Sequence, residues 1–448
     1  MLGDDRPQYP LVFQADLCFE GGVDPAAMQQ AFRFASGRHP LLRSTIRGEG
    51  RAAEWVTAAR GWPELAIFDG TAAGEPSLQA IDLNRSPGLR GWMRKTAVGW
   101  DVKLLFHHAC CDGQGARMFI QDLVLAYALL RDVSKSPTPF FPLDVTELDR
   151  RGRYPAPLGR ARQLGWKLQN VVQFFRRCPV PTAHDSTVSD KEDADVGDGN
   201  RLGICSHTFS AEESAELQAP SRRAAASLND VAVAILFSVL GSWQRSHGGD
   251  PKSWLRISVP CDLRGRDDER MPAANRFSYV FLNRRLGDCE SWEALLEGVQ
   301  SELQERLQTR FGVNFLSHLE RLARRPRLMR WMLGRKTCFS TAVLTNLSDP
   351  SRRLRKRLPV DENRFFWLDD ARCYDIRVRV PPLRPKTHWG ICILEYAGRM
   401  TVTFQYDRST LSADEAERLL GRYIESWRGW LKSTANRSQK SGTGLHVG

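Results

Sequence analysis

The stretch FHHACCDGQG, residues 106–115, decides the interpretation of the fold. It gathers two histidines, two cysteines, a carboxylate and two glycines at the end of an apolar segment. Four interpretations compete for it: a catalytic base, a metal site, a cysteine nucleophile, or an ordinary strand end whose polar residues perform no chemistry.

The residues that lead into this stretch, 102–108, have the pattern of a β-strand, in which successive side chains point to opposite faces. His108 continues the apolar face, whereas His107 lies on the other face. A neutral imidazole at a strand end can remove a proton near neutral pH, and burial would keep it neutral. We therefore expect His108 to be the base and His107 to support the strand end.

The turn after the histidines contains Asp112, Gly113 and Gly115. Asp112 can hydrogen-bond the loop or pair with an arginine. The glycines permit positive φ and a close approach of substrate. An apolar helix over residues 116–130 should follow, and the free N–H groups at its start suit a developing oxyanion.

The other interpretations of the stretch are weaker. A nucleophile at Cys110 or Cys111 needs a base that a third group orients. A metal site with both histidines and both cysteines would draw on opposite strand faces and lacks the usual ligand spacing. We expect no metal.

The pattern HHxxxDG, formed by His107, His108, Asp112 and Gly113, resembles the signature of the condensation-domain superfamily. These acyltransferases share the chloramphenicol acetyltransferase-like fold. Flanking segments are similar to the same family over nearly the full chain, at low identity. They are RHPLLRSTI (38–46), SLNDVAVAILFSVL (227–240), VPCDLRGR (259–266), ANRFSYVFLN (274–283) and YDRSTLSADEAERLLGRYIESW (406–427).

The resemblance implies an α/β (α+β, two-layer) fold with two subdomains that form a V and an active site in the channel between them. It implies that His108 deprotonates or orients the acceptor and that Gly113 lets substrate approach. Asp112 is implied to be structural, paired with Arg264 or, as second choice, Arg43.

Two further features follow from the resemblance. The family often has a polar segment opposite the histidine, for which Thr345 and Asn346 are the nearest match. Its variable motif positions fall on the two cysteines, which disfavours a thiol nucleophile.

The composition suggests where the subdomains divide. Residues 179–200 are low in apolar residues and acidic between basic neighbours, which is typical of a flexible linker. We expect an N-terminal subdomain over 1–178, the linker over 179–200, a C-terminal subdomain over 201–435 and a disordered tail over 436–448.

The net charge of +12 attracts phosphates in nucleic acid, anionic lipid, a coenzyme or a carrier protein. No nucleic-acid recognition motif is present, so nucleic acid is not expected as a partner. Two basic amphipathic segments, 158–177 and 318–336, are read first as solvated helix faces and otherwise as membrane or carrier contacts. Without a signal sequence, a membrane-length apolar run or CxxC pairs, a cytoplasmic protein is expected, or one peripheral to the inner face of a membrane.

The sequence thus predicts a freestanding acyltransferase without a permanently bound cofactor. Its co-substrate would be a coenzyme A or phosphopantetheine thioester, as acyl-CoA or acyl carrier protein, and its acceptor a small molecule with a hydroxyl or amine. The product would be an ester or amide. Two alternatives stay open: a wax-ester or diacylglycerol-type acyltransferase at a membrane surface, and a condensation-like module that binds without catalysis.

Overall fold

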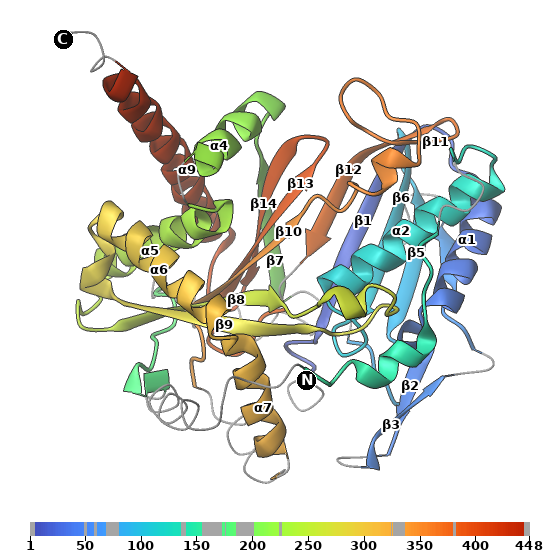
Figure 1. Cartoon of the computed structure of the whole chain (residues 1–448), viewed down its shortest axis with the longest axis horizontal. Coiled ribbons are helices and arrows are strands. Elements are labelled where there is room, and N and C mark those ends of the chain that lie inside the picture. Colours follow the sequence, from blue (N-terminus) through green and yellow to red (C-terminus); the bar gives the residue numbers. More distant parts are fainter. Residues whose placement is uncertain are drawn as a thin grey trace.

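The computed structural model shows two six-stranded sheets, each with helices on its outer side (Figure 1). In chain order, the first half contains β1 (Val12–Glu20), α1 (Pro25–Arg38), β2 (Ser44–Arg47), β3 (Glu54–Thr57), β4 (Leu65–Phe68), β5 (Leu89–Lys95), β6 (Gly99–His107) and α2 (Gly113–Leu130). The described residues are 5–48, 52–57, 61–68, 80–135, 140–154, 173–174, 176–184, 201–223, 226–323, 325, 337–379 and 382–442.

The second half is longer and supplies strands to both sheets. Its elements are β7 (Leu202–Thr208), α4 (Ala211–Arg223), α5 (Leu228–Ser246), β8 (Trp254–Asp262), β9 (Phe277–Arg285), α6 (Trp292–Gln308), α7 (Phe311–Ala323), β10 (Ala342–Ser348), β11 (Trp367–Leu368), β12 (Ala371–Arg379), β13 (Trp389–Tyr396), β14 (Arg399–Asp407) and α9 (Ala413–Gly442).

The first sheet has the order β11-β12-β1-β6-β5-β4, and the second has β7-β14-β13-β10-β8-β9. Strand β12 from the second half pairs antiparallel with β1, with Leu17 opposite Ile376. Residues 367–379 therefore complete the first sheet. A division of the chain at residues 179–200 would instead assign them to the C-terminal subdomain. Pairing between segments so far apart in sequence leaves no local pattern from which it could be predicted.

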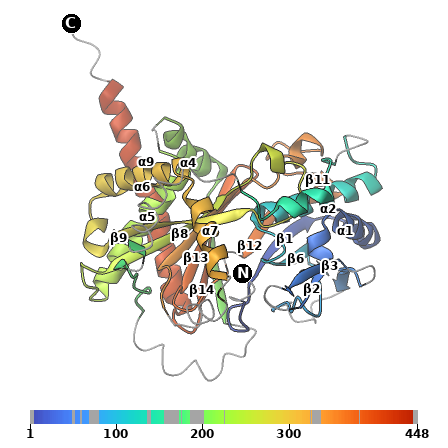
Figure 2. The ribbon, with the colours of Figure 1, turned by 60° about the horizontal axis from the view of Figure 1, so that its bottom comes forward.

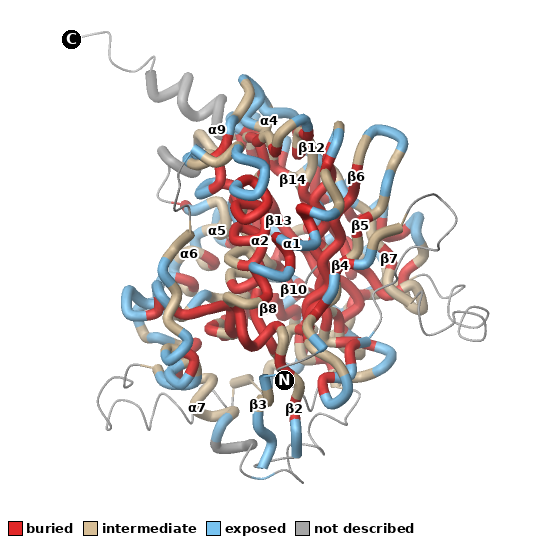
Figure 3. Tube along the Cα trace, turned by 90° about the vertical axis from the view of Figure 1, so that its right-hand side faces the viewer, coloured by how far each residue is buried: buried red, intermediate tan, exposed pale blue. Residues whose placement is uncertain are grey.

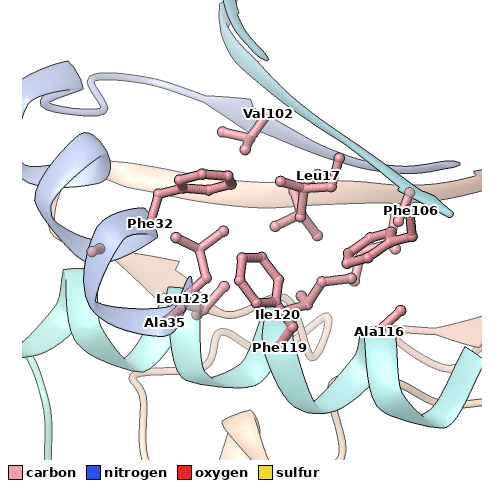
Figure 4. Close-up of a cluster of buried hydrophobic side chains, with 14 of the residues drawn as sticks. Leu17, Phe32, Ala35, Val102, Phe106, Ala116, Phe119, Ile120 and Leu123 are labelled. Atoms are coloured by element: carbon pink, nitrogen blue, oxygen red, sulfur yellow. The ribbon is translucent and has the colours of Figure 1, made fainter. Parts of the chain in front are cut away.

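Helices cover the outer faces of both sheets, so the two subdomains form a V with its helix-free sides inward (Figures 1 and 2). Helices α1 and α2 pack on the first sheet through Phe32, Phe119 and Phe106 (Figure 4). The ring centre of Phe119 lies 5.7 Å from that of Phe32 and also 5.7 Å from that of Phe106. Helices α5 and α9 contribute to the second core, where Tyr423 donates to the Ala232 carbonyl at 3.1 Å. Buried positions follow the strands of both sheets (Figure 3).

Local sequence signals account for several helix starts. Asp24 accepts hydrogen bonds from the N–H groups of Ala26 and Ala27 at the start of α1. A capping box opens α5, with Ser227 and Asp230 bonding each other's backbone N–H groups.

The predicted linker and tail are partly ordered. Val180 donates its N–H to the Trp254 carbonyl at 2.9 Å, and the indole N–H of Trp243 donates to the Ala183 carbonyl at 2.8 Å. Residues 179–184 therefore belong to the second subdomain, whereas 185–200 lie outside the described residues. Helix α9 continues to Gly442, beyond the predicted tail start at 436; residues 443–448 are outside the described part.

Candidate active site

His108 lies directly after β6, at the junction of the two subdomains. Its half-buried ring lies between Phe13 of β1 and Phe277 of β9, at centroid distances of 5.0 and 5.1 Å. Its N–H donates to the Leu11 carbonyl at 2.7 Å, and the Asn275 side-chain amide donates to its carbonyl. Both subdomains therefore fix the position of this histidine.

The His108 imidazole is kept in its neutral form. Burial lowers its pKa below the usual 6.5, while its own carbonyl, the charge of Asp112 and the Asn275 side chain act in the opposite direction. Its Nδ1 atom is buried and has no hydrogen-bond partner among the described residues. Because Nδ1 is enclosed, any proton exchange with a bound molecule would have to pass through Nε2.

His107 occupies a different environment. Its Nδ1 accepts the Ala109 N–H at 3.0 Å, so Nε2 carries the proton and donates to the Asp5 carboxylate, also at 3.0 Å. The side chain is fully buried. With both nitrogens engaged, His107 ties the N-terminal segment to the strand end.

Asp112 joins the two subdomains through a two-pronged ion pair. The two terminal nitrogens of Arg264 each donate to its carboxylate at 2.9 Å. The carboxylate also accepts the N–H of Arg276 at 2.8 Å and that of Gly115 at 2.9 Å, which caps helix α2. Arg43 does not take this place, because its guanidinium lies 4.5 Å from the ring centre of Trp62. The Gly115 N–H is thus engaged and unavailable to an oxyanion.

The two motif glycines are required for space and not for φ. Neither is among the described glycines with positive φ. A Cβ on Gly115 would lie 2.8 Å from the Cβ of Cys111 and 3.1 Å from the backbone nitrogen of Ala274. A Cβ on Gly113 would meet only the Leu347 side chain, at 2.9 Å. The expectation of positive φ is therefore wrong, because the turn brings helix and loop into close contact with ordinary backbone angles.

Thr345 and Asn346 lie half-buried in β10. Asn346 accepts the N–H of Ser348 at 3.0 Å with its side-chain oxygen. Within the described residues neither side chain bonds to His108. It is the intervening Leu347 that reaches the motif, at Gly113.

Cys110 and Cys111 are fully buried, and burial raises the pKa of both thiols strongly. A thiol held in its protonated form is a poor nucleophile. Among the described residues, no group of three histidine, cysteine or acidic side chains could hold a metal ion.

Sequence reasoning missed Phe13, Asn275 and Phe277, which surround His108. Asn275 and Phe277 belong to the segment ANRFSYVFLN, so its similarity to the family was the available signal. A surface cavity of about 610 Å³ lies elsewhere, between α4, residues 362–365 and the β13–β14 turn, and contains none of the site residues. Among the described residues, no helix is both long and apolar enough to cross a membrane.

No family model matches the chain. An uncharacterized protein of Mycobacterium tuberculosis is 24% identical over 320 residues, which cover 68% of this chain and 70% of that protein.

Solved structures match over nearly the whole chain. The epimerization domain from the third module of tyrocidine synthetase B has a TM-score of 0.65 at 12% identity, covering 97% of this chain and 94% of that one. The first condensation domain of the calcium-dependent antibiotic synthetase gives 0.65 at 16%, covering 95% and 92%. Polyketide synthase associated protein 5 from Mycobacterium tuberculosis gives 0.58 at 15%, covering 95% and 93%. The chain therefore has the condensation-domain fold, with two subdomains arranged in a V, as its HHxxxDG segment predicts.

Proposed function

We propose that this protein is an acyltransferase that moves an acyl group from a thioester to a hydroxyl or amine, with His108 as general base. The observation that carries the proposal is a neutral imidazole held between the two subdomains with Nδ1 enclosed. A base of this kind needs no metal and no nucleophilic side chain, and both neighbouring thiols are held protonated.

The reaction balances with His108 alone as proton carrier. Nε2 takes the proton of the acceptor hydroxyl or amine while the acceptor oxygen or nitrogen attacks the thioester carbonyl. The carbon–sulfur bond then breaks, and the leaving thiolate takes the proton from the imidazolium. Asp112 and Arg264 act as positioning residues, since their ion pair holds the turn after His108 against the second subdomain.

Two arginines support a phosphate-bearing donor. Arg117, in the first turns of α2, makes no hydrogen bond or ion pair with the described residues, and its buried Nε has no partner. Burial lowers its pKa, and so do the nearby charges of Arg353 and Arg264, whereas those of Asp262 and Asp349 raise it. The guanidinium of Arg353 lies over the Phe141 ring at 5.5 Å and forms no ion pair within the described residues. A phosphate would neutralise this repulsion, as coenzyme A or a phosphopantetheine arm provides.

The test is product detection by mass spectrometry with a panel of acyl-CoA donors and acyl-loaded carrier proteins, each with hydroxyl and amine acceptors. We expect a new ester or amide with wild-type protein and none with His108→Ala. The same acyl groups on N-acetylcysteamine, which lacks phosphate, should show a higher KM, and Arg117→Gln should raise KM for the phosphate-bearing donors alone. Binding of loaded carriers without turnover of any donor would instead favour a non-catalytic binding module.

A further inference from the structure

Strand β9 presents a row of aromatic side chains on the face turned away from α5 and α6. Val280 and Leu282 point into the core beneath α5 and α6, so Phe277, Tyr279 and Phe281 point to the other face. These three residues are called the aromatic row below. The row begins beside His108 and lies at the edge of the second sheet, where β9 pairs only with β8.

Ring contacts run without a break from the base along the strand. The Phe277 ring lies 5.1 Å from that of His108, 5.3 Å separates Phe277 from Tyr279, and 6.1 Å separates Tyr279 from Phe281. At its far end Phe281 contacts Phe174 at 5.1 Å and Phe315 of α7 at 5.0 Å. The row is thus anchored by packing at one end and meets the base at the other.

Exposure distinguishes the two ends. Phe281 is 8% exposed, as expected of a packed side chain, whereas Phe277 and Tyr279 are half-buried. Partly exposed aromatic rings next to the proposed base leave apolar surface that an apolar ligand could cover.

Strand β8, beside the row, places uncharged residues opposite Tyr279 and Phe281. Pro260 is opposite Tyr279 and Ser258 is opposite Phe281. Charged side chains stand at the two ends of the row: Asp262 is opposite Phe277 and bound to Arg264, and the guanidinium of Arg256 lies 6.0 Å from the ring centre of Phe281. Because Asp262 is paired with Arg264, and Arg256 donates to Asn283 and to three backbone carbonyls, the row is best suited to a neutral, apolar group.

We propose that the aromatic row binds the acyl group of the thioester donor and selects long apolar or aromatic acyl groups over acetyl. The inference rests on the proposed function and names its substrate class. The partly exposed stretch from Phe277 to Tyr279 spans about 7 Å at 3.3 Å per residue and ends at the packed Phe281, so an extended chain fits along it. The acyl carbonyl would lie at His108 and its tail along β9.

The test uses Tyr279→Ala, because Tyr279 lines the row without touching His108. With one acceptor held fixed, kcat/KM is measured for acetyl, octanoyl and benzoyl donors. The variant should lose about tenfold or more for octanoyl and benzoyl and change little for acetyl, since apolar pocket contacts discriminate on that scale. Tyr279→Phe should keep the wild-type preference. Phe34→Ala, an exposed aromatic on α1, should leave the ratio unchanged.

Other outcomes overturn the inference. An equal loss for all three donors would make the row purely structural, and a changed preference among acceptors would assign it to the acceptor. Binding of the unreactive thioether S-octyl-coenzyme A by calorimetry separates this inference from the proposed reaction. Weaker binding by Tyr279→Ala would support the row even if no turnover were found, and equal binding would refute it.

Discussion

Replacing Asp112 by alanine removes four hydrogen bonds and leaves a buried guanidinium short of its main counter-charge. The lost bonds are the two from Arg264 and those from the N–H groups of Arg276 and Gly115. The Arg264 side chain is 16% exposed and would keep only Asp262 at 3.0 Å and the Ala274 carbonyl at 2.8 Å. Breaking a buried ion pair lowers the free energy of unfolding by about 3–5 kcal/mol. Because Asp262 still pairs with Arg264, we expect a loss of about 3 kcal/mol here, the lost helix cap included.

The free energy is measured from urea unfolding, followed by tryptophan fluorescence and analysed for the first transition, since a two-subdomain protein need not unfold in one step. Arg264→Met should also destabilise the protein. The double variant should cost about 1–3 kcal/mol less than the sum of the two, because it no longer buries an unpaired charge. Arg131→Met, at an exposed ion pair with Asp369, is the control and should barely move the midpoint. Strict additivity, or an Asp112→Ala protein as stable as wild type, would refute this reasoning.

Three further predictions concern the motif. Burial lowers the pKa of His108, and only the neutral imidazole accepts a proton. We therefore expect kcat/KM to be constant around pH 7 and to fall only as the pH drops well below about 6.5. A fall that begins above about pH 7 would contradict this. Cys110→Ala and Cys111→Ala should retain activity, and both thiols should resist iodoacetamide at about pH 8 while the exposed Cys178 reacts, as peptide mapping would show. Gly115→Ala should lower the unfolding midpoint, because its new Cβ would meet backbone atoms. Gly113→Ala should fold normally and lose turnover, because its new Cβ would meet only the flexible end of the Leu347 side chain. Equal midpoints for the two variants would argue against this packing.

The parts of the site that depend on local sequence were predictable. Asp112 and the caps of α1 and α5 follow from side chains within a few residues of the helix starts they bond. Arg264 was reached through the family resemblance, since nothing near residue 112 indicates a partner 152 positions away.

Long-range register limited the rest. Phe277 meets His108 because β9 pairs with β8 in one register and begins beside His108. The crossing of β12 into the first sheet has no local signal either. The basic segments at 158–177 and 318–336 stay predictions. Most of their residues lie outside the described part of the chain, apart from the end of the first and the portion of α7 up to Ala323.

The central claim is that His108 is a neutral general base. The most direct measurement is single-turnover acyl transfer, by quenched-flow mass spectrometry, for wild type, His108→Ala and His108→Gln, with circular dichroism to confirm folding. We expect a rate lower by about 10²–10⁴-fold in both variants, with donor binding retained. Transfer at the wild-type rate by a folded His108→Ala protein would contradict it.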